Sequence, residues 1–148
     1  MKSSMDGEKR IRPINVCLVL DISGSMGGPL SYDMNNLEYE GTKKTRLELS
    51  QDAIWMLYKK LNPDDIFSLV VFHNQARTVL KSEFVKNLDS DGVKEMIYQK
   101  FESGGTTIRN GFDEAVKNIK NIRENNEISH YEHRIVMLTD VCDNSLQN

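Results

Sequence analysis

The residues best suited to chemistry in this sequence are a carboxylate and two hydroxyls that alternate along a short stretch, Asp21, Ser23 and Ser25. Gly24 lies between the two serines and lets the backbone turn sharply, so the three oxygens can converge on one point. Carboxylate and hydroxyl oxygens are hard ligands of the kind that Mg²⁺ or Mn²⁺ prefers. We therefore expect a divalent-cation site here.

This group follows an apolar run, residues 16–20, which carries no charge and is rich in branched side chains. Bounded by Pro13 on one side and glycines on the other, the run indicates a strand that is buried on both faces. Open α/β sheets place their ligand crevices at the carboxyl ends of such strands. The sequence therefore predicts a central strand that carries Asp21 to the ligand-binding edge of a sheet.

Two further segments offer oxygen ligands at comparable places. Residues 104–107 contain two glycines and two threonines at the start of a helical pattern, so either Thr106 or Thr107 can contribute. The apolar run 135–139 is followed by Asp140. In a doubly wound sheet the first and last long strands lie side by side, so the three segments meet. Two carboxylates and three hydroxyls suit a divalent ion that keeps some of its waters.

The rest of the pattern indicates how these segments are positioned. Buried strands are expected at 16–20, 65–72 and 134–139, with residues 76–80 as an antiparallel partner after the turn 73–75. Three amphipathic helices are expected. Their apolar faces are Leu47, Ser50, Ala53, Ile54, Leu57 and Leu61; then Val93, Met96, Ile97 and Phe101, capped by Asp89 or Ser90; then Ile108, Phe112, Ala115, Val116, Ile119 and Ile122. This order predicts a doubly wound, mostly parallel α/β sheet with helices on both faces.

Several residues that can bind ligands elsewhere have plainer interpretations here. Trp55 lies off the main helical stripe and is interpreted as a half-buried packing residue. The two cysteines, Cys17 and Cys142, are interpreted as buried thiols rather than a disulfide framework. No Cys, His or carboxylate lies at metal-ligand spacing beside His73, which is interpreted as a turn residue. His130 and His133 are interpreted as solvated loop residues.

Composition limits the class of protein. With 148 residues, 39% of them hydrophobic, the chain is long enough for one domain with a real core. A net charge of −3 with no basic patch excludes an ordinary nucleic-acid binder, and no apolar run is long enough to span a bilayer. Residues 1–12 read as a flexible polar tail without a signal peptide, and residues 13–148 as the domain. We expect a cytoplasmic protein.

Taken together, Asp21-x-Ser23-x-Ser25, Gly104-Gly105-Thr106 and Leu138-Thr139-Asp140 resemble the metal-ion-dependent adhesion site of von Willebrand factor type A (VWA) domains. The resemblance implies that Ser23, Ser25 and Thr106 approach the ion directly, while Asp21 and Asp140 hold it directly or through water. It favours Thr106 because Gly111 lies at the family's spacing, and leaves Thr107 to cap the helix. A Glu or Asp carboxylate of a partner protein would take the open coordination position.

The resemblance runs from about residue 15 to residue 143. Domains of this family have two further strand-helix units after the position of Asp140, so we expect this chain to be the N-terminal two-thirds of a VWA domain and a fragment of a longer protein. The strand 134–139 would then have an uncovered edge, and self-association through residues 135–138 is expected. The loop 27–42 is longer than is common in the family; it either shapes partner access or is mobile.

The opposing functional class is a Mg²⁺-dependent phosphotransferase with Asp21 as its nucleophile. That chemistry needs a second acid or a lysine for the phosphoryl oxygens, and no lysine closely follows any of the three segments. The sequence motifs of serine hydrolases and P-loop enzymes are absent. Ser25 as a nucleophile would need a general base, and no histidine is placed to act as one. We therefore expect binding rather than catalysis.

Overall fold

The computed structural model describes residues 12–28, 44–125 and 127–139. Most of the expected N-terminal tail, most of the loop 27–42, Cys142 and Asp140 lie outside these ranges.

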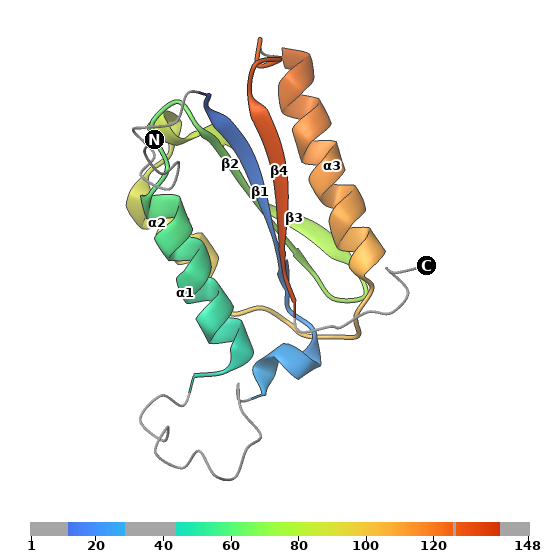
Figure 1. The fold of residues 1–148 in the computed structure, drawn as a ribbon. Coiled ribbons are helices and arrows are strands. Elements are labelled where there is room, and N and C mark those ends of the chain that lie inside the picture. Colours follow the sequence, from blue (N-terminus) through green and yellow to red (C-terminus); the bar gives the residue numbers. More distant parts are fainter. Residues whose placement is uncertain (1–11, 29–43, 126, 140–148) are drawn as a thin grey trace, which may run out of the picture.

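A central sheet carries helices on both of its faces (Figure 1). Its strands within the described residues are β1 (Ile14–Asp21), β2 (Ile66–Phe72), β3 (Ala76–Phe84) and β4 (Glu132–Leu138), in the order β3-β2-β1-β4. β1 pairs in parallel with both β2 and β4, whereas β3 runs antiparallel to β2. The predicted mostly parallel α/β sheet is confirmed.

The two central strands explain why their sequences are continuously apolar. Every residue of β1 and β2 is buried, because each strand has neighbours on both edges and helices on both faces. Alternate side chains of β1 serve opposite faces: Leu18 packs in one core cluster and Val19 in the other. Cys17 is buried, as predicted, and burial raises the pKa of its thiol to about 11.

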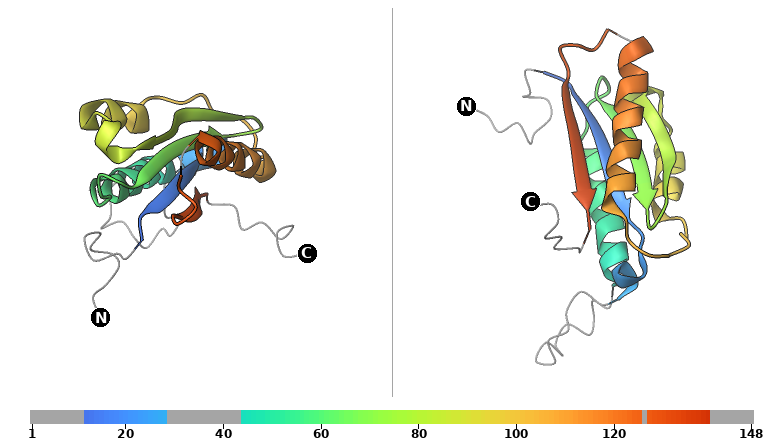
Figure 2. Two further views of the ribbon diagram at one scale, coloured as in Figure 1. Left: turned by 90° about the horizontal axis from the view of Figure 1, so that it is seen from above. Right: turned by 90° about the vertical axis from the view of Figure 1, so that its right-hand side faces the viewer.

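The helices are α1 (Arg46–Lys59), α2 (Ser90–Tyr98) and α3 (Ile108–Asn125), with short 3-10 helices η2 (Gly24–Gly27) and η4 (Val85–Asn87). α1 and α2 pack on one face of the sheet and α3 on the other (Figure 2). Asp89 caps α2 by accepting a hydrogen bond from the Gly92 N–H at 3.0 Å, so the first of the two predicted caps is confirmed. Trp55 is half-buried and stacks on Tyr58, as expected.

The helical faces differ from the predicted stripes at several positions. In α1 the buried residues are Gln51, Ile54 and Tyr58, and Ala53 is exposed. Met96 in α2 is 42% exposed and Phe112 in α3 is 45% exposed. Phe101 packs against the core from beyond the end of α2.

Gly111 explains the exposure of Phe112. A Cβ at Gly111 would lie only 2.8 Å from Cδ1 of Phe72 and 3.0 Å from Cγ1 of Val19, so the glycine is where α3 approaches the sheet most closely. The next residue along the helix is turned about 100° away from that contact. Residue spacing predicted a helix correctly but placed Phe112 on the wrong side of it.

Two strand boundaries also differ from the predictions. β3 extends to Phe84, beyond the expected residues 76–80, because its antiparallel pairing with β2 continues to the Ile66–Phe84 pair. β4 begins at Glu132, so His133 is a strand residue rather than a solvated loop residue. Its Nδ1 lies 3.0 Å from Nδ2 of Asn15 on β1, and burial, assisted by Arg123, lowers the pKa of His133.

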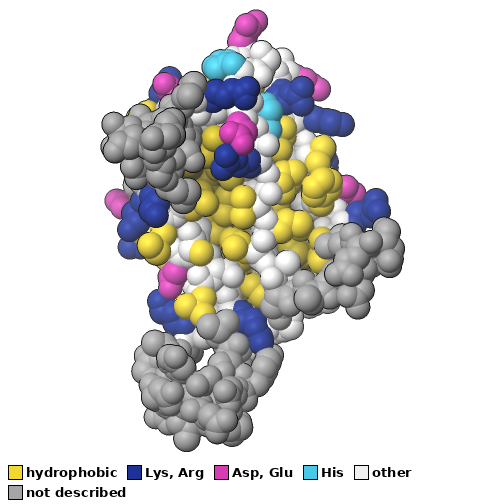
Figure 3. All heavy atoms as spheres, viewed as in Figure 1, with side chains coloured by type: hydrophobic (Ala, Val, Ile, Leu, Met, Phe, Trp, Pro, Cys, Tyr) yellow, Lys and Arg dark blue, Asp and Glu magenta, His cyan; other side chains and the backbone are white. Residues whose placement is uncertain are grey.

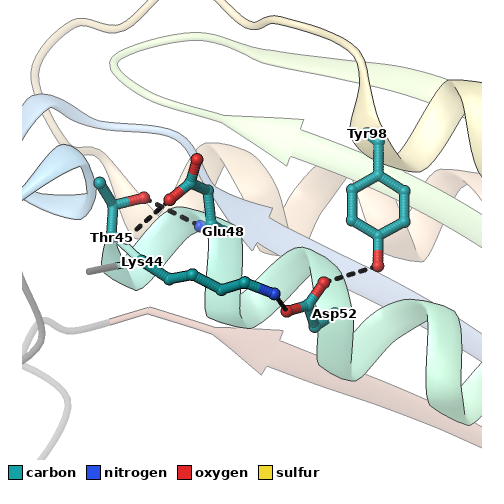
Figure 4. A network of polar contacts seen from close by, with 5 residues as sticks. All are labelled: Lys44, Thr45, Glu48, Asp52 and Tyr98. Carbon is teal, nitrogen blue, oxygen red and sulfur yellow. Dashed lines mark hydrogen bonds and ion pairs between the residues drawn. The ribbon is translucent and has the colours of Figure 1, made fainter. Parts of the chain in front are cut away.

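A network of polar contacts fixes the first turns of α1 and links them to α2 (Figure 4). Thr45 and Glu48 form a capping box, in which each side chain accepts from the other residue's backbone N–H. Asp52 lies between Lys44, at 2.5 Å, and the Tyr98 hydroxyl, which donates to it at 2.7 Å. The hydrogen bond from Lys44, with that from Tyr98, lowers the pKa of Asp52.

β4 is an edge strand of the described sheet and its residues are half-buried or exposed. Hydrophobic atoms gather on the surface between α1 and α3, where Figure 1 places β1 and β4 (Figure 3). The edge position agrees with the uncovered edge expected for strand 134–139. The expected burial of that strand is wrong, because no described strand pairs with its outer edge.

Candidate functional site

The site begins where β1 ends in a buried carboxylate. Asp21 has no exposed surface, and Oδ1 of its carboxylate accepts a hydrogen bond from the Ser23 N–H at 2.8 Å. Oδ2 accepts from the Thr139 hydroxyl at 2.6 Å. Both donors are neutral, so they orient the carboxylate and offset part of its desolvation without cancelling its charge.

The two serines lie beside this carboxylate at the start of η2. Their hydroxyl oxygens are 3.3 Å apart, with Ser23 buried and Ser25 exposed. η2 is tied to α1, because the Arg46 guanidinium donates to the Ser25 carbonyl at 3.2 Å and the Arg46 N–H donates to the Gly28 carbonyl at 3.0 Å. The hydroxyls therefore lie on a turn that Arg46 anchors to α1 at two carbonyls.

Gly24 does not play the part expected of it. The turn is a 3-10 helix, and a Cβ placed on Gly24 would meet no atom within 4 Å. The backbone there is outside the left-handed region, so an alanine can adopt the same conformation. The serine hydroxyls approach each other because of the helical turn, without any requirement for glycine.

The segment with the two threonines passes directly beside this turn. The Gly24 N–H donates to the Gly104 carbonyl at 3.1 Å, and the Thr107 N–H donates to the His73 carbonyl at 2.9 Å. Thr106 is exposed, and α3 begins at Ile108, which leaves Thr107 at the position just before the helix. The structure thus brings Asp21, Ser23, Ser25 and the Thr106 segment to one end of the sheet (Figure 1).

β4 completes this end of the sheet. Its parallel pairing with β1 places Leu138 beside Leu20, so the residue that follows each strand lies at the same edge. Asp140 is outside the described residues. Its neighbour Thr139 holds Asp21, a role that the sequence analysis missed. The signal available was a hydroxyl placed directly after an apolar run and directly before the predicted ligand Asp140.

The donor chemistry of the described site fits a small hard cation. It consists of hydroxyl oxygens together with a buried carboxylate, which are oxygen ligands of the type that Mg²⁺ or Mn²⁺ takes. Within the residues that the structure describes, no group of three or more His, Cys, Asp or Glu side chains gathers as a metal centre. A soft-metal site of the zinc type is therefore not built from this part of the chain.

Known proteins resemble this chain in sequence and in fold. An uncharacterized protein of Synechocystis sp. is 30% identical over 135 residues, which cover 91% of this chain and 27% of the relative. The PilB minor pilin of Streptococcus sanguinis superposes with a TM-score of 0.64 at 18% identity, covering 88% of this chain and 31% of the pilin. An aerotolerance-related membrane protein of Bacteroides fragilis gives 0.62 at 20% identity, covering 84% and 52%.

At these identities the solved structures show a likeness of fold. The chain spans about a quarter of the curated relative and about half or less of these two solved structures. In the described ranges, every helix is too short or too polar to cross a membrane. The profile of the von Willebrand factor type A domain matches residues 16–142, so this chain belongs to the VWA domain family.

Proposed function

We propose that this domain binds a partner protein through a divalent cation. Mg²⁺ or Mn²⁺ would be held at the end of β1 by the hydroxyls of Ser23, Ser25 and Thr106, with Asp21 and Asp140 as ligands directly or through water. The ion would supply an open coordination position for a Glu or Asp carboxylate of the partner. Domains of this family are commonly protein-interaction modules, which supports the general class of function.

The observation that carries the proposal is the burial of Asp21 without a positive donor at either oxygen. An ionised carboxylate is costly to bury unless a charge or strong hydrogen bonds compensate it. Its two donors, the Ser23 N–H and the Thr139 hydroxyl, are neutral. A divalent cation at the adjacent serine hydroxyls would supply the missing charge. The same hydrogen bonds would hold the carboxylate in place before the ion arrives.

The same geometry argues against the phosphotransferase alternative. A nucleophilic carboxylate must present an oxygen to the substrate, but Asp21 is fully buried and both of its oxygens accept hydrogen bonds. Thr106 and Ser25, by contrast, are exposed, as ligands of an ion that a partner must reach would be. We therefore expect an interaction domain without turnover of its own. The cytoplasmic location stays a prediction, and the Bacteroides fragilis protein is named as a membrane protein.

The test is retention of proteins from the source cell on the immobilised chain. We expect a set of proteins that binds in Mg²⁺, is released by EDTA, returns with Mn²⁺ and is absent with Asp21→Asn. The matched control is Asp91→Asn, which removes an exposed carboxylate in the first turn of α2. Retention that is indifferent to EDTA and to Asp21→Asn would refute the proposed function.

A further inference from the structure

A cavity of about 420 Å³ opens between the β2–β3 hairpin and the segment that joins α2 to α3. Apolar side chains of Ile22, Val71 and Ala76 line it, and the first two are almost completely buried. The exposed side chains of Arg77, Lys100 and Glu102 also line it and bring charge to the cavity. The cavity thus combines an apolar wall with charged groups that solvent and a partner can reach.

The cavity shares two walls with the proposed cation site. Ile22, which lines the cavity, lies in the chain between Asp21 and Ser23. The α2–α3 segment contributes Lys100 and Glu102 to the cavity and leads directly on to Thr106 of the proposed cation site. The hydrogen bond of 3.1 Å from the Gly24 N–H to the Gly104 carbonyl joins these two walls. One extended partner segment can therefore contact both places.

The charge of the cavity is positive on balance. Arg77 and Lys100 contribute two cations against one carboxylate from Glu102. Among the ion pairs of the described residues, none involves Arg77 or Lys100. The Arg77 guanidinium lies 5.9 Å from the centre of the Phe101 ring, a contact that holds the cation on a residue packed against the core. A guanidinium held in this way and not paired with a carboxylate is suited to bind one from outside.

We propose that this cavity binds a second acidic side chain of the same partner segment whose first carboxylate reaches the cation. The aliphatic stem of the second residue would pack on Ile22, Val71 and Ala76, and its carboxylate would pair with Arg77 and Lys100. This inference rests on the proposed cation-dependent function, because it takes the cation as the first anchor. The domain would then recognise a pair of acidic residues at a set spacing, which a single metal-bound carboxylate does not specify.

The test uses two series of synthetic peptides with blocked ends and the full chain in Mn²⁺. Each peptide has a Glu, then one to four glycines, then either Glu or Gln; the spacers cover spans of roughly 7 to 17 Å. At one spacing we expect the Glu-ending peptide to bind about threefold tighter than its Gln partner, the scale of one exposed charge pair. Isothermal titration calorimetry gives the dissociation constants.

Variants locate the preference on the cavity. Arg77→Gln and Lys100→Gln should each reduce the preference for Glu, and Glu102→Gln should increase it because a competing carboxylate is removed. Lys81→Gln is the matched control, since Lys81 is an exposed cation on the same strand as Arg77 but does not line the cavity. Melting temperatures of all variants check that the fold is unchanged.

The outcomes separate the two proposals. The cavity assignment is overturned if the Glu-ending and Gln-ending peptides bind equally well at every spacing, or if neither binds. It is also overturned if the preference for Glu survives both Arg77→Gln and Lys100→Gln. Repeating the titrations in EDTA tests the cation instead: binding that is unchanged without Mn²⁺ contradicts the proposed function, whatever the peptide series show. A preference for Glu that needs Arg77 and a binding that needs Mn²⁺ support both.

Discussion

Replacing Asp21 by asparagine separates the charge of this residue from its hydrogen bonds. The carboxylate is fully buried and accepts from the Ser23 N–H at 2.8 Å and the Thr139 hydroxyl at 2.6 Å. An asparagine has nearly the same shape. Its carbonyl oxygen can accept from Ser23, and its amide can donate to the Thr139 hydroxyl, which can rotate to accept. Asp21→Asn therefore keeps both contacts and removes a buried charge.

The expected magnitudes follow from this geometry. Exchanging two charge-assisted hydrogen bonds for neutral ones loses about 1 kcal/mol each, and relief of the buried charge returns a comparable or larger amount. Asp21→Asn without metal should thus unfold within about 1 kcal/mol of the wild type, or be more stable. Asp21→Ala removes the acceptor of both donors and should lose about 2–6 kcal/mol, taking about 1–3 kcal/mol for each donor.

Urea unfolding in EDTA and in Mn²⁺ measures both effects. In the wild type, free Mn²⁺ at ten times its dissociation constant should add about 1.4 kcal/mol to the free energy of unfolding. Asp21→Asn should lose most of this increment while keeping its stability in EDTA. The reasoning is refuted if Asp21→Asn is as unstable as Asp21→Ala in EDTA, since the charge would then be structural, or if Mn²⁺ stabilises both proteins equally.

Three further predictions concern the scaffold. Gly111→Ala should lower the free energy of unfolding by about 1–3 kcal/mol in urea, because the new Cβ would lie 2.8 Å from an aromatic carbon of Phe72. Gly24→Ala is the control and should not destabilise the chain, because its Cβ would have no atom within 4 Å. Burial and Arg123 lower the pKa of His133 from 6.5, so neutral His133 contributes to the free energy of unfolding above pH 6.5, and this contribution is lost as the pH falls below 6.5. The urea midpoint should therefore fall less between pH 8 and pH 5 in His133→Gln than in the wild type. Self-association through β4 should appear as concentration-dependent sedimentation that Met137→Lys reduces, and equal sedimentation of the two would exclude that edge.

The sequence was sufficient for the parts of the fold that depend on continuous apolar runs. β1 and β2 are recognisable because strands in the middle of a sheet lack polar alternation, and β4, at the edge, is recognisable from its short apolar run. Asp21 could be placed at the carboxyl end of β1 for the same reason. The orientation of each helix could not, because residue spacing defines a stripe without saying which neighbouring face the sheet contacts. The close approach at Gly111 decides that for α3.

The sequence was sufficient to predict the candidate ligands, but not the residues that hold those ligands in place. Alternating Asp21, Ser23 and Ser25 are visible in one short segment, but the bond from Thr139 to Asp21 crosses 118 positions and exists only because β4 pairs with β1. The positive cavity is hidden for the same reason, since Arg77 and Lys100 come from separate elements. Contacts between distant segments carry no local pattern.

The most direct test of the cation site is calorimetric titration of the chain with Mn²⁺. We predict weak binding of one ion by the wild type, with water completing its shell, and loss of that binding in the double variant Ser23→Ala, Ser25→Ala. Ser103→Ala, an exposed hydroxyl in the α2–α3 segment, should bind as the wild type does. An isotherm that the double variant leaves unchanged would contradict the assignment of these hydroxyls as ligands.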